Sequence, residues 1–161
     1  MKKSLALLLI LAGASCNNSV LGAGDPSDPA TEQFATQLNV DIATFQQTEG
    51  GVYIRDLREG SGEVAAEADQ VTITYAGYLK DGTLFDSRSA PTQLALAATV
   101  EGFREGVIGM RVGGIRKIVI PSELAYSWEG RPDADPPIPR NATLIFDVEL
   151  FGVTKPATTT Q

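Results

Sequence analysis

The sequence predicts an α+β domain that consists mostly of strands, with one short helix packed on a sheet. Segments such as 71–79 and 141–151 alternate apolar and polar residues, which is the period of a half-buried strand. The dipeptide Asp81-Gly82 lies between two strand-like segments and is a strong hairpin signal. Within this region, residues 100–110 carry apolar side chains at helical spacing. Strands that outnumber a single helix favour the α+β class.

The first half of the domain, which begins near residue 49, is predicted to be sheet. Residues 52–57 alternate as an edge strand, and residues 71–79 form a longer strand. In the Asp81-Gly82 turn, both central residues are expected to have a positive φ, as in tight two-residue hairpins. The chain then returns as strand 83–86, and a separate short strand is expected over residues 93–96.

The helix is expected over residues 100–110. Thr99 is placed to cap its N-terminus, and Gly113-Gly114 prevent its continuation. The apolar stripe of this helix consists of Val100, Phe103, Val107 and Met110. The stripe is expected to pack on the sheet.

The second half of the domain adds two strands and a loop. Residues 115–120 are predicted to form a central strand, which Pro121 ends. Residues 128–140 are rich in Pro, Asp and Gly and predict a long surface loop. In the last strand, 141–151, the predicted inward side chains are Leu144, Phe146, Val148 and Leu150, and the predicted solvated ones are Asp147 and Glu149.

Residues 1–15 are predicted to be a signal peptide, because two lysines precede a short apolar run and small residues. Cys16 follows directly, as in the lipobox of bacterial lipoproteins, although Gly13 stands where that motif usually has Leu. We therefore expect Cys16 to be lipidated and to anchor the protein to a membrane. The alternative is an ordinary secretory signal cleaved near Ser15. In both cases the protein is exported, to a membrane surface or to the periplasm.

The segment 16–48, between the lipidated N-terminus and the domain, is expected to act mainly as a flexible tether, since residues 17–35 carry few large apolar side chains. At its end, one apolar set recurs at the spacing of a short amphipathic helix and consists of Phe34, Leu38, Ile42 and Phe45. This helix is expected to brace the domain or, alternatively, to form a dimer contact. At the other terminus, residues 153–161 are predicted to be a disordered tail.

Composition excludes several classes of function. The formal net charge of −7 and the pI near 4.5 argue against nucleic-acid binding, which needs basic side chains for the phosphates. The chain has no histidine, the commonest metal ligand and general base. Its single cysteine cannot form an internal disulfide or a cysteine-cluster zinc site. We therefore expect no metal and no cofactor.

Several motifs, taken in order, resemble the FKBP-type peptidyl-prolyl cis–trans isomerases over residues 49–152. They are Tyr75-x-Gly77 with Asp81-Gly82 and Phe85-Asp86-Ser87, Val100-x-Gly102-Phe103, Met110-x-Val112-Gly113-Gly114, Ile120-Pro121 with Ala125-Tyr126, and Ile138-Pro139-x-Asn141-Ala142-Thr143-Leu144. The resemblance implies an antiparallel β-sheet wrapped around one short α-helix. It also implies an enzyme that accelerates rotation about X-Pro peptide bonds.

In this family the proline ring enters an aromatic pocket between sheet and helix. The resemblance implies catalytic roles for Asp86, Tyr126, Tyr75, Phe85 and Phe146, and substrate-binding roles for Val100, Phe103 and Ile138. Phe103 would form the pocket floor, and the Val100 N–H and the Tyr126 hydroxyl would donate hydrogen bonds to peptide carbonyls. Taken alone, Val100, Phe103 and Phe146 would suit a plain core equally well, whereas the hydroxyls of the tyrosines favour a lined cavity.

The sequence departs from the family pattern at the pocket wall. Pro91-Thr92-Gln93-Leu94 stands where the family has Pro-Phe-x-Phe, so one pocket aromatic is replaced by Thr92 or lost. The loop that contains Ala98 is shorter than usual, and the loop after Tyr126 is longer. These departures bear on substrate range and macrolide affinity more than on the reaction.

The predicted function is therefore peptidyl-prolyl isomerisation that assists protein folding outside the cytoplasm. The partners it implies are unfolded or Pro-containing client polypeptides, macrolide inhibitors, and a membrane reached through the lipid anchor. A non-catalytic chaperone or peptide-binding module of the cell envelope is the alternative. A structural lipoprotein with a degenerate pocket is a third interpretation, against which the retained aromatic residues argue.

Overall fold

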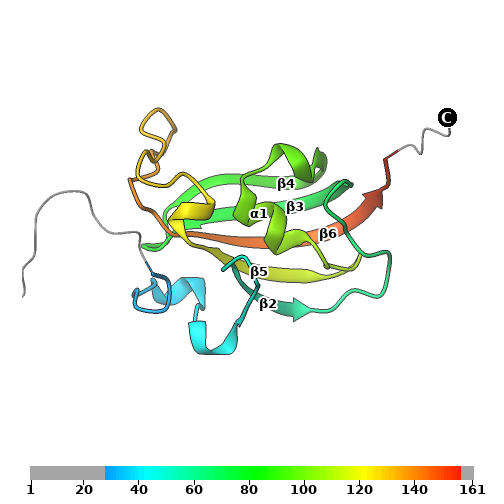
Figure 1. The fold of residues 1–161 in the computed structure, drawn as a ribbon, viewed down its shortest axis with the longest axis horizontal. Coiled ribbons are helices and arrows are strands. Elements are labelled where there is room, and N and C mark those ends of the chain that lie inside the picture. The colour runs from blue at the N-terminus through cyan, green and yellow to red at the C-terminus, as the bar shows by residue number, and fades with distance from the viewer. Residues whose placement is uncertain (1–27, 157–161) are drawn as a thin grey trace, which may run out of the picture.

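The computed structural model describes residues 28–156 (Figure 1). The predicted signal peptide, Cys16, residues 17–27 of the predicted tether and residues 157–161 of the predicted tail lie outside these residues. The described part of the chain contains no helix long and apolar enough to cross a membrane.

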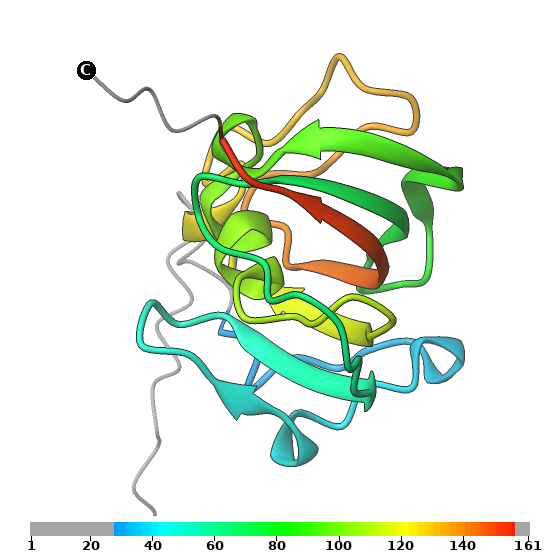
Figure 2. The same ribbon diagram turned by 90° about the vertical axis from the view of Figure 1, so that its right-hand side faces the viewer.

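Six strands form one antiparallel sheet that curls around a single α-helix (Figures 1 and 2). The strands are β1 (Gln46–Gln47), β2 (Tyr53–Arg58), β3 (Gln70–Leu79), β4 (Leu84–Ala95), β5 (Ile115–Ile120) and β6 (Leu144–Thr154). Their order in the sheet is β1-β2-β5-β6-β3-β4. Helix α1 (Glu101–Val107) lies against one face (Figure 2). The predicted α+β class and the wrapped sheet are confirmed.

Strand β6 lies in the middle of the sheet, between β5 and β3. Its inward side chains were predicted correctly, since Leu144, Phe146, Val148 and Leu150 are all buried. Asp147 and Glu149 alternate with them on the outer face and are half-buried, where they pair with Lys117 and Arg58. Period-two alternation thus located the central strand and its inward side chains, but Asp147 and Glu149 are less solvated than predicted because Lys117 and Arg58 pair with them.

The helix is shorter than predicted, and Thr99 does not cap it. Val100 is the N-cap residue and makes no side-chain capping bond. Thr99 instead ends a short 3-10 helix (Leu96–Ala98), where its Oγ1 donates to the Leu96 carbonyl at 2.7 Å. The helix stops before Gly109, which has a φ of 82°, so Met110 packs in the core from a turn.

Arg116 of β5 fixes the C-terminal end of α1. Its buried guanidinium donates to the carbonyls of Gly106 and Ile108 at 3.0 and 3.3 Å. The same group forms a bidentate ion pair with Asp56, with distances of 2.7 and 2.9 Å. The last carbonyls of a helix lack partners within the helix, so a cation at this end satisfies them and complements the helix dipole.

The β3–β4 turn differs from the expected tight hairpin. Gly82 has a φ of 91°, whereas Asp81 does not have a positive φ. The Gly82 N–H donates to the Leu79 carbonyl, and the Leu79 N–H donates to the Thr83 carbonyl, both at 2.9 Å. The turn is therefore one residue longer than a two-residue hairpin and places only its glycine in the left-handed region.

Strand β4 is one long element and not the two short strands predicted. It pairs with β3 from Leu84 to Ala95, with two register shifts. Pro91 lies within it, which is tolerated because β4 is an edge strand and one side of its backbone is unpaired. The polar residues between the two predicted segments are therefore part of the same strand.

The segment before residue 49 lies on the outer face of the sheet. It forms two 3-10 helices, Thr36–Leu38 and Ile42–Thr44, and not the single amphipathic helix predicted. Leu38 is buried against Val119 and Ile145, so the expected role as a brace is confirmed. Asn39, with a φ of 51°, separates the two short helices.

The described end of the predicted tether also packs on the domain, contrary to the expectation of a free linker. The Ala35 N–H donates to the Lys80 carbonyl at 2.8 Å, and Lys80 Nζ pairs with Glu32 at 2.8 Å. The side chain of Glu32 is only 7% exposed. Residues 32–35 therefore form part of the folded unit.

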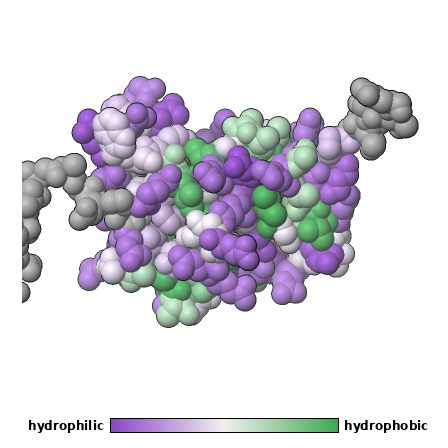
Figure 3. Space-filling model, in the orientation of Figure 1, coloured by the Kyte–Doolittle hydropathy of each residue, from purple (hydrophilic) through white to green (hydrophobic). Residues whose placement is uncertain are grey.

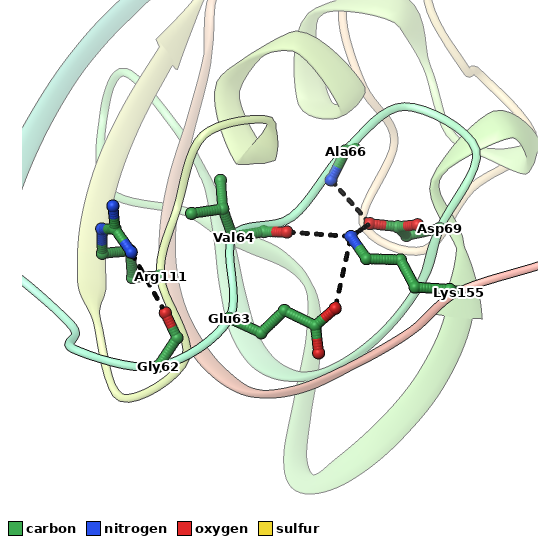
Figure 4. Close-up of polar contacts among 7 residues, drawn as sticks. All are labelled: Gly62, Glu63, Val64, Ala66, Asp69, Arg111 and Lys155. Atoms are coloured by element: carbon green, nitrogen blue, oxygen red, sulfur yellow. Dashed lines mark hydrogen bonds and ion pairs between the residues drawn. The ribbon is translucent and has the colours of Figure 1, made fainter.

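The start of the predicted tail is anchored as well (Figure 4). Lys155 Nζ lies 2.7 Å from the buried Asp69 carboxylate and 3.5 Å from Glu63, and it donates to the Val64 carbonyl at 3.1 Å. The Asp69 carboxylate also accepts from the Ala66 N–H at 2.7 Å. Pairing with Lys155 lowers the pKa of Asp69 and raises the pKa of Lys155.

Candidate active site

A cavity of about 340 Å³ opens between α1, the inner face of the sheet and the loop after β5. Its lining residues are Tyr75, Asp86, Leu94, Ala98, Thr99, Val100, Phe103, Tyr126, Arg131 and Phe146. The structure thus brings together six of the eight side chains predicted to form the pocket. The two that do not line it are Phe85 and Ile138.

Three aromatic rings form the floor of the cavity. Phe103 and Phe146 meet edge to face with centroids 5.0 Å apart, and Tyr75 lies 5.9 Å from Phe103 and 6.1 Å from Phe146. Phe103 and Phe146 are buried, so their rings are held by the core below. Edge-to-face packing fixes the rings relative to one another and produces a rigid apolar surface.

Phe85 supports this floor from behind. Its ring meets Phe146 edge to face at 5.5 Å. Both rings lie over Gly77 of β3, where an added Cβ would come within 2.7 Å of Phe146 and 2.9 Å of Phe85. Glycine at residue 77 is therefore required for the two rings to lie this close to the strand.

Ile138 belongs to the hydrophobic core and holds the loop that borders the cavity. It is buried, and its backbone forms a two-hydrogen-bond bridge with Arg131. The Arg131 N–H donates to the Ile138 carbonyl at 2.8 Å, and the Ile138 N–H donates to the Arg131 carbonyl at 3.0 Å. Ile138 therefore anchors a lining residue that the sequence analysis missed.

Asp86 and Tyr75 form the polar pair at the edge of the cavity. The Tyr75 hydroxyl donates to Asp86 Oδ2 at 2.7 Å, and Arg88 Nη1 lies 3.2 Å from Asp86 Oδ1. Burial, followed by the hydrogen bond to Asp86, raises the pKa of Tyr75 to about 12. Tyr75 therefore stays protonated and orients the carboxylate.

Leu94, and not Thr92, forms the part of the cavity wall where the family has an aromatic residue. The Thr92 hydroxyl donates to the Ala90 carbonyl at 2.9 Å, and Thr92 does not line the cavity. Leu94 lies two residues further along β4, on the same face, and does line it. The period of two along the strand was the signal that could have identified it.

Tyr126 and Arg131 border the cavity from the loop after β5. The Arg131 guanidinium carbon lies 5.4 Å from the centroid of the Tyr126 ring. The Gly130 N–H donates to the Tyr126 carbonyl at 3.0 Å, which closes the loop between the two side chains. The proximity of Arg131 depends on this loop closure, which sequence spacing does not reveal.

Another hollow, of about 450 Å³, lies on the outer face of the sheet. Among its lining residues are Tyr78, Leu84, Asp147 and Glu149, and it has no floor of packed aromatic rings. The cavity between α1 and the sheet combines an apolar floor with convergent polar groups, which is typical of a ligand site. It is therefore the candidate active site.

Comparison with known proteins identifies the family. The family described as FKBP-type peptidyl-prolyl cis-trans isomerase matches residues 62–151. The chain belongs to this family. It is a peptidyl-prolyl cis–trans isomerase, as the resemblance implied, and this favours the enzyme over the non-catalytic interpretations.

Relatives of the FKBP-type isomerase include proteins of similar and of greater length. An FK506-binding protein of Neisseria meningitidis serogroup B is 44% identical over 109 residues, which cover 65% of this chain and 97% of the relative. The Escherichia coli isomerase FkpA is 38% identical over 129 residues, which cover 78% of this chain and 44% of FkpA.

Solved structures of this isomerase family share the fold. The crystal structure of FkpA has a TM-score of 0.62 and 36% identity, covering 70% of this chain and 52% of that one. A peptidyl-prolyl isomerase from Pseudomonas syringae has a TM-score of 0.65 and 28% identity, covering 70% of this chain and 82% of that one. Both support the FKBP-like fold.

Proposed function

We propose that the cavity between α1 and the sheet is the site of X-Pro rotation, and that the protein assists the folding of Pro-containing clients outside the cytoplasm. The observation that carries the proposal is the rigid aromatic floor beside the Tyr75–Asp86 pair. A proline ring is apolar and its amide is polar, so a floor of rings next to fixed polar groups suits both parts.

The chemical task is rotation about a partial double bond. The barrier for peptide rotation is about 18–20 kcal/mol, and X-Pro isomerisation takes roughly tens of seconds or longer without help. The reaction forms and breaks no covalent bond and transfers no proton. The protein's contribution is therefore to bind the twisted amide more tightly than the planar one.

The residues around the cavity suit this task. A planar amide separates charge more than a twisted one, so an apolar floor of Phe103 and Phe146 disfavours the planar form. The Val100 N–H and the Tyr126 hydroxyl are our proposed donors to the peptide carbonyls, and fixed donors add further selectivity. Asp86, held by the Tyr75 hydroxyl, supplies a fixed negative charge at the edge of the cavity.

A protease-free isomerisation assay on short X-Pro-Phe peptides tests the site. We expect Asp86→Ala and Phe146→Ala each to lower kcat/KM by about tenfold or more, which corresponds to about 1.4 kcal/mol. Circular dichroism would verify that each variant is folded. Unchanged turnover in a folded variant would exclude that residue, and peptide binding without acceleration would favour the binding module.

We also propose that the protein reaches its clients as an exported lipoprotein. The support is the short apolar segment, ending in the small residues Gly13, Ala14 and Ser15, that precedes Cys16. Metabolic labelling with a fatty-acid analogue in cells should label the full chain, and Cys16→Ser should abolish the label. A labelled Cys16→Ser variant, or an unlabelled parent, would contradict lipidation of Cys16. The protein would then be an ordinary secreted protein.

Macrolide binding at the same cavity is part of the proposal. The support is the name of the Neisseria meningitidis relative, an FK506-binding protein, together with the shared fold. FK506 should inhibit isomerisation competitively with the peptide. Because Leu94 replaces an aromatic wall in this chain, we expect Leu94→Phe to tighten inhibition. Inhibition that does not compete with peptide would contradict a shared site.

A further inference from the structure

One lining residue of the cavity has no part in the mechanism described above. Arg131 contributes a positive charge to a site that is otherwise apolar or hydroxyl-bearing, apart from Asp86. It does so in a chain whose formal net charge is −7. A cation at the border of a peptide site can select among peptides by charge.

The backbone of Arg131 is fixed firmly for a loop residue. Its two hydrogen bonds to the backbone of Ile138 tie it to a residue that is only 4% exposed and belongs to the core. Its carbonyl also accepts from the Ala134 N–H at 3.2 Å. The guanidinium therefore extends from a defined base and lies over the Tyr126 ring.

The two charged side chains that line the cavity, Asp86 and Arg131, differ in how fully other side chains neutralise them. The Asp86 carboxylate is engaged by both the Tyr75 hydroxyl and Arg88. Arg131 Nε donates to Asp133 at 3.3 Å, but Asp133 lies outside the cavity lining and its side chain is 71% exposed. The contacts with Asp133 and Tyr126 leave several of the five donors of the guanidinium unused, so the group can donate to the carboxylate of a bound peptide.

We propose that Arg131 is a specificity-determining residue that makes the site favour segments with an acidic side chain next to the proline. This inference rests on the proposed function of the same cavity. A client carboxylate beside the proline would replace or share the exposed contact with Asp133. A guanidinium binds a carboxylate through two parallel hydrogen bonds and so recognises it by geometry as well as by charge.

The test compares peptides that differ only in charge beside the proline. One series places Glu, Gln or Lys before the proline, and a second series places the same residues after it. The value of kcat/KM for each peptide is measured by NMR exchange spectroscopy with the parent, Arg131→Gln and Arg131→Glu. Arg140→Gln is the matched control, because Arg140 lies in the same loop over Trp128 and does not line the cavity.

In at least one series, the ratio of kcat/KM for Glu over Gln should be about threefold higher in the parent than in Arg131→Gln. This is the size expected for a half-exposed ion pair. Arg131→Glu should reverse the preference toward Lys, and Arg140→Gln should keep the parent's ratio. The difference should shrink at high salt, because salt screens exposed charges.

This inference would be overturned if the ratio of kcat/KM for Glu over Gln were the same in the parent and in both Arg131 variants, in both series. The proposed isomerase function would be unaffected by that result. A ratio that Arg140→Gln changes as much as Arg131→Gln would also overturn it, since the effect would then belong to the loop as a whole. A folded parent that accelerates no peptide would instead overturn the proposed function.

Discussion

At the scale of single residues, the hydrogen bond from Tyr75 to Asp86 links the electrostatics of the site to its geometry. The pKa of Tyr75 is raised to about 12, by burial first and then by Asp86. A carboxylate raises the pKa of a phenol because it stabilises the protonated donor and repels the phenolate. Asp86→Asn removes the charge, so the pKa of Tyr75 should fall while remaining above its ordinary value of 10.0 through burial.

This prediction can be measured by NMR titration of the tyrosine ring carbons, with Tyr75→Phe to assign the signal. Asp133→Asn is a suitable control, because Asp133 pairs with Arg131 and not with Tyr75. If the Tyr75 titration is unchanged in Asp86→Asn, the hydrogen bond in the structure is not the cause of the raised pKa.

The motifs in the sequence named most of the side chains that line the candidate cavity, but not all of its wall. Tyr75, Phe146 and Phe103 were found because their motifs recur together in a known family. Leu94 was missed because Thr92 stood at the position of the family's aromatic, although the period of two along β4 places Leu94 on the same face as Thr92. Arg131 was missed because a loop bridge with Ile138 brings it there. Contacts that depend on loop closure leave no periodic signal.

At the scale of elements, the seven-residue helix α1 depends on tertiary contacts. A helix this short is marginal in isolation, so its stability comes from packing and from the groups that satisfy its ends. Arg116 satisfies its last carbonyls and pairs with Asp56. We expect Arg116→Met to lower the free energy of unfolding by about 2–3 kcal/mol, because it leaves a carboxylate and two carbonyls without their cation.

Urea unfolding, followed by circular dichroism, measures this loss. Arg111→Met is the matched control, because the Arg111 guanidinium makes only a 3.4 Å hydrogen bond to Gly62 and should lose no more than about 0.5 kcal/mol. Equal stability of the two variants would show that Arg116 does not support the helix end.

Element boundaries were predicted less well than element types, for identifiable reasons. Thr99 was a chemically suitable cap, but it closes the preceding 3-10 helix, and Val100 begins α1 without a side-chain cap. Strand β4 was predicted as two short strands, yet it is continuous through Pro91, which an edge position accommodates. In both cases local propensity was overridden by the neighbours of the segment in space.

At the scale of the whole molecule, other parts of the chain pack on both faces of the sheet. Helix α1 covers the inner face, and residues 34–45 cover part of the outer face, as the views in Figures 1 and 2 indicate. On the side that carries α1, the surface is mostly hydrophilic and its apolar residues form separate small patches (Figure 3). The segment before residue 49 therefore contributes to the stability of the domain itself.

Leu38→Ala tests the contribution of this outer cover. Leu38 is 4% exposed and packs with Val119 and Ile145, so its truncation should cost about 2–3 kcal/mol of unfolding free energy. Leu57→Ala is the control, because Leu57 is 50% exposed on β2 and should cost less than about 1 kcal/mol. A cost for Leu38→Ala no greater than for Leu57→Ala would mean that the segment does not stabilise the sheet in solution.

The C-terminal contact of Lys155 with Asp69 closes the domain at its other end (Figure 4). Pairing with Lys155, first among the causes, lowers the pKa of Asp69 below its ordinary value of 3.8. A carboxyl group whose pKa is lowered by folding contributes stability that is present above its unfolded pKa and lost as the pH falls through its folded pKa. The parent should therefore lose stability on acidification below a pH of about 3.8, and Lys155→Met should be less stable above that pH and lose less on acidification.

Urea unfolding at several pH values distinguishes this electrostatic role from simple packing. Lys155→Arg keeps the positive charge and should restore most of the pH dependence, whereas Lys155→Met should not. If Lys155→Met loses the same amount of stability at pH values above and below the titration of Asp69, the side chain acts through its methylene packing alone. The end of β6 and Lys155 would then close the domain without the ion pair.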